Sequence, residues 1–136
     1  MKYVNFLSLF LSLSFTVQAS DHLDSYYQKY EQCTSSERNK KPLTENVMAE
    51  HGLSKQDLKY ILIIKGIRIA TCSQKEEKEY LDSANKNELI TTQSEYNKLI
   101  LSKLSKEELI HINAINQSLV EFNIDVNIIS LYDKLK

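Results

Sequence analysis

The most apolar stretch after the first twenty residues is Ser54–Cys72 (SKQDLKYILIIKGIRIATC). Its apolar residues leave no clean polar face before Lys65 and Arg68, and a helix that is apolar nearly all round is typically buried. Ser54 and Asp57 also match a helix start, because their oxygens can accept hydrogen bonds from the unpaired amides of the first turn. The pattern predicts a buried central helix. Its apolar residues are Leu58, Ile61, Leu62, Ile64, Ile67 and Ile69.

A hairpin is the alternative for part of this stretch. Tyr60–Ile64 and Ile67–Cys72 are rich in β-branched residues, and Lys65 with Gly66 could form the turn between them. Short apolar runs do not separate the two structures by periodicity. The helix is favoured because a helix-start signal precedes the stretch and a helical pattern follows it, so the central helix is expected to continue through Gln74–Asp82. Gly66 costs a helix about 1 kcal/mol relative to alanine, which suggests that another helix crosses close to it.

Amphipathic segments precede the central stretch. Tyrosines and other apolar residues at helical spacing predict a first helix over Asp21–Cys33. The polar segment Thr34–Leu43 contains Pro42 and is expected to be a loop. Thr44–His51 is predicted to be a short helix that ends at Gly52 in the left-handed conformation.

Two reciprocal capping patterns, Thr92 with Glu95 and Ser105 with Glu108, predict two further helices. The residues expected to face inward on them are Tyr96, Leu99, Ile100 and Leu104 on the first and Leu109, Ile112, Ile115, Leu119 and Phe122 on the second. Asp125 is expected to cap a last helix. Its predicted inward residues are Ile128, Ile129, Tyr132 and Leu135. With two glycines and one proline in the chain, the sequence predicts an all-α bundle of five to six helices around a buried central helix.

The first nineteen residues have the pattern of a signal peptide. Lys2 supplies a positive start, Phe6–Val17 is a short apolar run, and Val17-Gln18-Ala19 matches a cleavage site. Residues 1–19 are therefore predicted to be removed, which leaves one helical domain over residues 20–136. No cysteine follows the cleavage site, so no membrane anchor is expected after cleavage. The expected location is periplasmic or secreted.

Export would place Cys33 and Cys72 in an oxidising compartment, where a disulfide between them is expected. Removing Lys2 leaves 16 basic against 18 acidic residues. This near-neutral balance argues against nucleic acid and against anionic membrane surfaces as partners.

Catalytic motifs are absent from the sequence. It contains no HExxH, no GxSxG and no glycine-rich phosphate loop, so neither enzymatic activity nor a cofactor is expected. Glu108 and His111 resemble one ligand pair of di-iron bundles, but such sites need two pairs and further carboxylates. An exposed polar pair is the favoured interpretation.

Cleavage after Ala19 would leave Ser20, Asp21 and His22 at a free amino terminus. The amine, two amides and the imidazole could form a square of four nitrogens, a geometry that Cu(II) and Ni(II) favour. Histidine also occurs at the third position by chance, so this is a weak candidate metal site.

Seven tyrosines remain after cleavage, and Tyr26, Tyr27 and Tyr30 cluster on the first helix. Tyrosine has an apolar body and a polar tip, which suits both cores and interfaces. Packing of the first helix is the favoured explanation, but three aromatic side chains so close together predict that at least one is partly exposed. The predicted partner-binding surface combines these tyrosines with the loop cations Arg38, Lys40 and Lys41.

Without a catalytic constellation, the leading hypothesis is a periplasmic protein-binding module, such as an immunity or inhibitor protein that blocks a toxin or a cell-wall-degrading effector. In size, export and helicity the chain resembles the helical immunity proteins that are paired with secreted amidases, although no motif is matched. Two alternatives are a periplasmic stress chaperone and a carrier of a small apolar ligand. The expected partner is another protein, with a homodimer as a further possibility.

Overall fold

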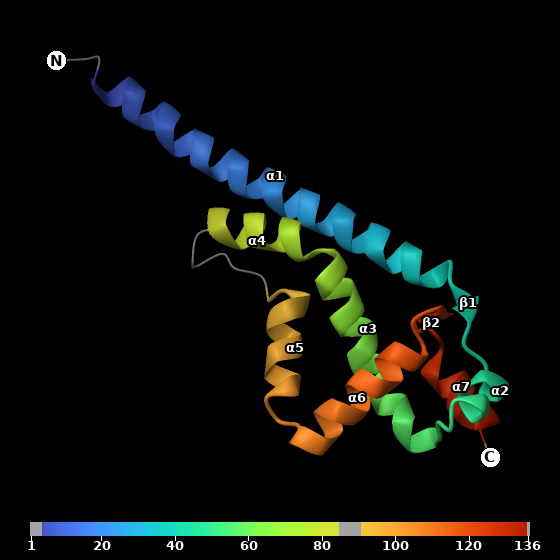
Figure 1. Cartoon of the computed structure of the whole chain (residues 1–136). Coiled ribbons are helices and arrows are strands. Elements are labelled where there is room, and N and C mark those ends of the chain that lie inside the picture. The colour runs from blue at the N-terminus through green and yellow to red at the C-terminus, as the bar shows by residue number, and fades with distance from the viewer. Residues whose placement is uncertain (1–3, 85–90, 136) are drawn as a thin grey trace.

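The computed structural model describes residues 4–84 and 91–135, with the backbone alone for residues 4–19 (Figure 1). The described residues form seven α-helices, one 3-10 turn and two short strands. In chain order the elements are α1 (Val4–Arg38), β1 (Lys41–Pro42), α2 (Glu45–Glu50), η1 (Lys55–Asp57), α3 (Leu58–Cys72), α4 (Gln74–Ser83), α5 (Gln93–Leu101), α6 (Lys106–Ser118), β2 (Phe122–Asn123) and α7 (Ile128–Lys134). The predicted all-α fold is confirmed, although the described residues form seven helices where the sequence predicts five to six.

Helix α3 is the predicted buried central helix. It contacts α1, α5 and α6, and Figure 1 shows it running from η1 to the start of α4 with α5 beside it. Ile61 and Ile64 are completely enclosed. The helix is continuous from Leu58 to Cys72, which excludes the hairpin alternative.

The start of α3 follows the predicted capping chemistry. Asp57 Oδ2 accepts hydrogen bonds from the Ser54 backbone N–H at 2.8 Å and from the Ser54 hydroxyl at 3.0 Å. Ser54 precedes the 3-10 turn η1, and Asp57 is the last residue of that turn. The caps of α5 at Thr92 and of α6 at Ser105 are also as predicted, and Gly52 follows α2 with a left-handed φ of 68°.

Helix α5 crosses α3 at Gly66. A Cβ atom at this position would lie 2.6 Å from Asn97 Oδ1 and 2.8 Å from Gln93 Nε2. Any other residue would push these side chains away. The close crossing that the sequence indicates at Gly66 is therefore confirmed, and the crossing helix is α5.

Helix α1 is fixed to the fold by a covalent bond and by a buried tyrosine. Cys33 and Cys72 form the predicted disulfide, which joins α1 to the last residue of α3. The ring of Tyr26 stacks on Tyr80 of α4 with centroids 6.1 Å apart, and its hydroxyl accepts a hydrogen bond from the Gln93 N–H at 3.3 Å.

Helix α1 ends later than predicted. It continues to Arg38, so the first half of the predicted loop Thr34–Leu43 is helical and that part of the prediction is wrong. Glu37 in this last turn is buried and pairs with Arg68 of α3 at 3.2 Å and with Lys40 at 2.6 Å. The ion pair with Arg68 stabilises this polar turn as a buried helix end. Because Arg68 is distant in the sequence, local composition does not indicate the pairing.

The central helix does not continue through Gln74–Asp82 without interruption. It ends at Cys72, and a new helix, α4, begins at Gln74. The buried hydroxyl of Ser73 donates to the Ile69 carbonyl at 2.9 Å, a side-chain bond that often bends helices. The break directs α4 along α1, as Figure 1 shows.

Helix α6 ends at Ser118, before the predicted end at Phe122. It ends there because Arg68 forms hydrogen bonds with the free carbonyl groups at the end of α6. The guanidinium donates to the carbonyl oxygens of Asn116 at 3.0 Å and Leu119 at 2.8 Å. These oxygens have no partner within a helix that ends here. Phe122 then begins β2, which pairs in parallel with β1.

The predicted cap of the last helix is also wrong. Asn127 caps α7, and its Oδ1 accepts a hydrogen bond from the Ser130 N–H at 3.0 Å. Asp125 instead forms ion pairs with Lys65 of α3 and Arg38 of α1. The carboxylate is therefore used to join distant helices.

Several apolar side chains predicted to face inward are exposed. They are Leu62 on α3, Tyr96 and Leu99 on α5, and Ile129 and Tyr132 on α7. On α5 the crossing at Gly66 turns Asn97 toward α3, so the tyrosine next to it faces solvent.

Candidate functional site

The three tyrosines of the predicted partner surface differ in exposure. Tyr26 is buried, Tyr30 is partly exposed, and the side chain of Tyr27 is 45% exposed. The prediction that at least one of them is partly exposed is confirmed. Tyr27 offers the largest open aromatic face of the three.

The three cations of the same predicted surface take part in ion pairs within the chain. The pairs are Arg38 with Asp125 at 2.5 Å, Lys40 with Glu37 at 2.6 Å and Lys41 with Glu121 at 2.6 Å. Arg38 comes eleven residues after Tyr27, or about 16 Å along a helix. The structure thus does not gather the tyrosines and cations into one compact patch.

The two candidate metal motifs have different surroundings. Ser20, Asp21 and His22 lie inside α1, and their site would need a free amine at Ser20, whose nitrogen is part of a peptide bond in the uncleaved chain. Glu108 accepts hydrogen bonds from the Ser105 N–H at 3.0 Å and the Tyr60 hydroxyl at 3.0 Å. Within residues 20–84 and 91–135, no three His, Cys, Asp or Glu side chains gather where they could hold a metal ion.

His111 pairs with the carboxylate that caps η1. Its Nε2 lies 2.7 Å from Asp57 Oδ1, and its ring meets the edge of Tyr60 at a centroid distance of 5.3 Å. Burial raises the pKa of Asp57, but the hydrogen bonds from His111 and Ser54 lower it by more, so the pKa lies below its ordinary value. The pair fixes α6 on the start of α3.

The pKa of a second carboxylate, Asp125, is lowered in the same way. Burial raises the pKa of Asp125, but the hydrogen bonds and charges of Lys65 and Arg38 lower it by more. Both carboxylates therefore hold their protons less tightly in the folded state than in the unfolded chain.

The free energy of unfolding is expected to fall as the pH is lowered below about 5. A carboxylate with a lowered folded-state pKa contributes its full stability above the unfolded value near 4, and loses it as the pH falls through the folded pKa. Urea unfolding at a series of pH values measures this. Asp125→Asn should lower the stability at pH 7 and flatten the acid decline, whereas Asp133→Asn, at an exposed site on α7, should change neither. An unchanged acid slope in Asp125→Asn would contradict this explanation.

A buried carboxylate holds the start of α5. Glu77 of α4 accepts hydrogen bonds from the Thr92 hydroxyl and, at 2.6 Å, from the Ser94 hydroxyl. These bonds fix the start of α5 against α4. These bonds could not be predicted, because Glu77 lies in a charged run that is typical of a solvated helix face.

Two grooves flank the crossing of α3 and α5. The first, called the Tyr96 groove, has a volume of about 260 Å³. The residues that line it include Lys59, Leu62, Ile63, Tyr96, Asn97 and Ile100. The side chains of Leu62 and Tyr96 are 53% and 54% exposed, so this groove presents apolar surface to solvent.

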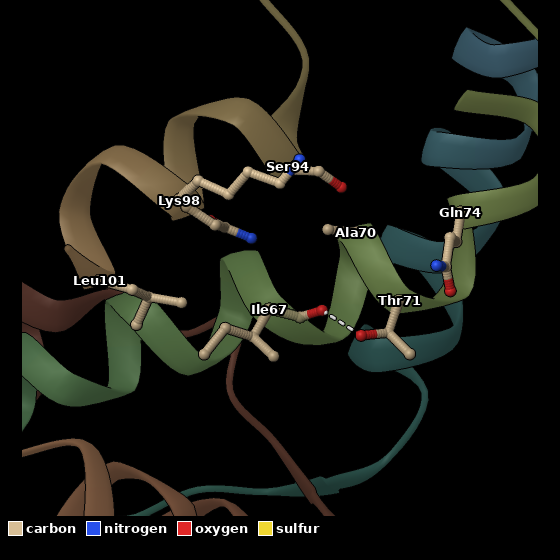
Figure 2. A pocket seen from close by; sticks show the side chains of 8 residues that line it. Ile67, Ala70, Thr71, Gln74, Ser94, Lys98 and Leu101 are labelled. Carbon is tan, nitrogen blue, oxygen red and sulfur yellow. Dashed lines mark hydrogen bonds between the residues drawn. The ribbon is translucent and has the colours of Figure 1, made fainter. Parts of the chain in front are cut away.

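The second, called the Lys98 groove, has a volume of about 220 Å³ and is shown in Figure 2. Ile67 and Ala70 of α3 and Leu101 of α5 line it, together with polar side chains. The Thr71 hydroxyl beside it donates to the Ile67 carbonyl at 2.8 Å (Figure 2). This groove is more polar at its rim than the Tyr96 groove.

The charged side chains that line the two grooves are both lysines. Lys59 lies in the Tyr96 groove and Lys98 in the Lys98 groove. Lys59 is 3.3 Å from Glu108 but its side chain remains largely exposed. Sequence reasoning missed these grooves, since Leu62 and Tyr96 read as core residues. The one available signal was Gly66, which marks where a helix crosses α3.

Comparison with known protein families, with curated proteins and with solved structures finds no match for this chain. Among the helices of the described residues, none is long and apolar enough to cross a membrane. Fold and chemistry therefore define the class: a small all-α protein, linked by one disulfide, with two grooves beside its central helix.

Proposed function

We propose that this protein is an exported protein-binding module of the periplasm, and that it acts as an immunity or inhibitor protein against a toxin or a cell-wall-degrading effector. The observation that carries the proposal is the exposed apolar pair Leu62 and Tyr96 across the Tyr96 groove. A partner protein that inserts apolar side chains between α3 and α5 would cover this pair.

Export is supported by the cysteine chemistry and by the first residues of the chain. A disulfide such as Cys33–Cys72 persists in oxidising compartments. The tertiary contacts of α1 described above, through Tyr26, Cys33 and Glu37, all come after residue 19. In Figure 1 the first part of α1 extends beyond α4, away from the other helices. Removal of residues 1–19 as a signal peptide would leave those contacts in place.

The chemistry of the grooves suits a protein partner. Tyrosine is enriched among residues that dominate binding energy, because it offers a large rigid surface with a polar tip. Leu62 and Tyr96 supply that apolar surface at the centre, and Lys59 and Lys98 supply positive charge beside it. A partner with an acidic rim and an apolar segment is therefore the best match, with charge mainly speeding association.

Truncation of Tyr96 to alanine is expected to weaken partner binding by about 2 kcal/mol, or roughly 30-fold, because the aromatic ring fills the contact that excludes water. Tyr27→Ala is the matched control, since this tyrosine is exposed to a similar degree on α1. Its affinity should equal that of the wild type. Calorimetric titration measures both affinities, and the melting temperature of each variant should be unchanged.

The partner for these titrations is isolated by crosslinking from the exported proteins of the source organism. The proposal is supported if Tyr96→Ala binds the partner more weakly than Tyr27→Ala does. It is also supported if adding the wild-type protein inhibits the partner's enzymatic activity. Weakening by Tyr27→Ala alone would move the site to the α1 surface. Normal binding by both variants would remove the Tyr96 groove from the proposal. Capture of many unfolded proteins with similar affinity would favour a stress chaperone.

A further inference from the structure

We infer that cleavage after Ala19 creates a binding site for Cu(II) or Ni(II) at the new amino terminus, made by Ser20, Asp21 and His22. This inference rests on the export that is part of the proposed function. The metal ion would bind at a site separate from the two grooves between α3 and α5.

The four donor atoms are the Ser20 amine, the backbone nitrogens of Asp21 and His22, and Nδ1 of the His22 ring. One α-carbon and one carbonyl carbon separate each backbone nitrogen from the next, so neighbouring nitrogens close small chelate rings on one ion. The imidazole of His22 completes the square, because its own side chain returns Nδ1 to the remaining corner. Square-planar nitrogen sets favour Cu(II) and Ni(II) over other common divalent ions.

When the metal ion binds, it displaces protons from its nitrogen ligands. The oxidation state of the metal does not change. Each of the two amides gives up its proton to solvent as its nitrogen binds the metal. The amine also loses a proton where it is protonated, and its ordinary pKa lies near 8. Affinity should therefore rise steeply with pH, as it does wherever ligands must be deprotonated.

The structure explains why the site depends on cleavage. In the uncleaved chain Asp21 and His22 lie within α1, where each amide N–H donates to the carbonyl four residues earlier. Those acceptors belong to Val17 and Gln18 and leave with the signal peptide. The amides of the new first turn then have no partner within the helix, and both become available to a metal ion.

The fold can accept the rearrangement of this turn. Ser20 and Asp21 are exposed and His22 is partly exposed. Four residues further on, Tyr26 is buried against Tyr80, and its hydroxyl accepts the Gln93 N–H. The first turn can thus unwind around an ion while α1 keeps its packing from Tyr26 onward.

The test uses the product that the cell exports after synthesis of the full chain Met1–Lys136. Its intact mass identifies the first residue, and Cu(II) alone is then titrated against it with visible absorption and proton release as readouts. We expect a first residue of Ser20, one ion per chain and release of at least two protons per ion. Full chain retained in the cytosol, with residues 1–19 attached, should lack this absorption band.

Two variants assign the site. His22→Ala should abolish the absorption band, whereas His51→Ala, at an exposed histidine beyond α2, should leave it unchanged. A product that begins at Ser20 but gives no band, or a band that survives in His22→Ala, would overturn the metal site and leave the export proposal intact. A product that begins at another residue would overturn both the cleavage position and the metal site.

Discussion

Replacement of Ile64 by aspartate is expected to unfold the protein. Ile64 is 0% exposed in the middle of α3 and packs in the core with Ile61, Ile112 and Leu119. A carboxylate there would lose its hydration without gaining a partner, at a cost of several kcal/mol. Loss of the apolar contacts adds about 2–5 kcal/mol, and the sum approaches the about 5–15 kcal/mol that stabilises a typical domain. Circular dichroism and thermal melting measure the outcome.

Leu62→Asp is the matched control, because it places the same charge two residues earlier on the same helix. The Leu62 side chain is 53% exposed, so an aspartate there keeps its hydration. This variant should melt within a few degrees of the wild type. If Ile64→Asp also melted like the wild type, α3 would not be the buried centre of the fold.

Loss of the disulfide is expected to have the second largest effect. Cys72→Ser should lower the free energy of unfolding by about 2–5 kcal/mol, because the bond closes a long loop of the unfolded chain and so reduces its entropy. The bonded cysteines are 39 positions apart, for which the chain-entropy model gives roughly 4 kcal/mol. Urea unfolding under non-reducing conditions compares the variant with the wild type.

Two further measurements test the bond itself. Thiol labelling of the denatured, unreduced wild type should find no reactive cysteine, and a reducing agent should lower the stability of the wild type to that of Cys72→Ser. Quantitative labelling of both cysteines would contradict the bond and weaken the case for an oxidising compartment.

The central helix and most helix starts could be predicted because their causes are local. Ser54 with Asp57 and Thr92 with Glu95 are capping residues three positions apart, and such pairs act within a single turn. Gly66 likewise indicated that another helix crosses close to it, because glycine destabilises a helix and is therefore expected only where a larger residue would not fit. The sequence did not indicate which helix would cross there.

The missed features depend on contacts between distant parts of the chain. Arg68 ends α6 by binding carbonyl groups about fifty positions away, and it also stabilises the last turn of α1 through Glu37. Glu77 sets the direction of α5 through Thr92 and Ser94. No local pattern identifies such partners, because each of these side chains reads as an ordinary surface residue.

The two grooves beside α3 could not be predicted for the same reason. Tyr96 follows the helical period of an inward position, and only the orientation of α5 at Gly66 turns it outward. Conversely, Arg38 and Lys41 read as free cations, but Asp125 and Glu121 come back to them from the end of the chain. Composition could suggest that aromatic side chains are exposed, while the position of the grooves depends on the packing of α5.

The contacts between the end of α1 and the segment around β2 bear on how the chain folds. Arg38 meets Asp125 across 87 positions and Lys41 meets Glu121 across 80, and contacts with such long loops form slowly. The end of α1 can therefore find these partners only when the final residues of the chain are also available for folding. Proteolytic loss of the residues after Leu119 would therefore remove α7 and, with Asp125 and Glu121, also loosen the far end of α1, although the two helices lie far apart in the sequence.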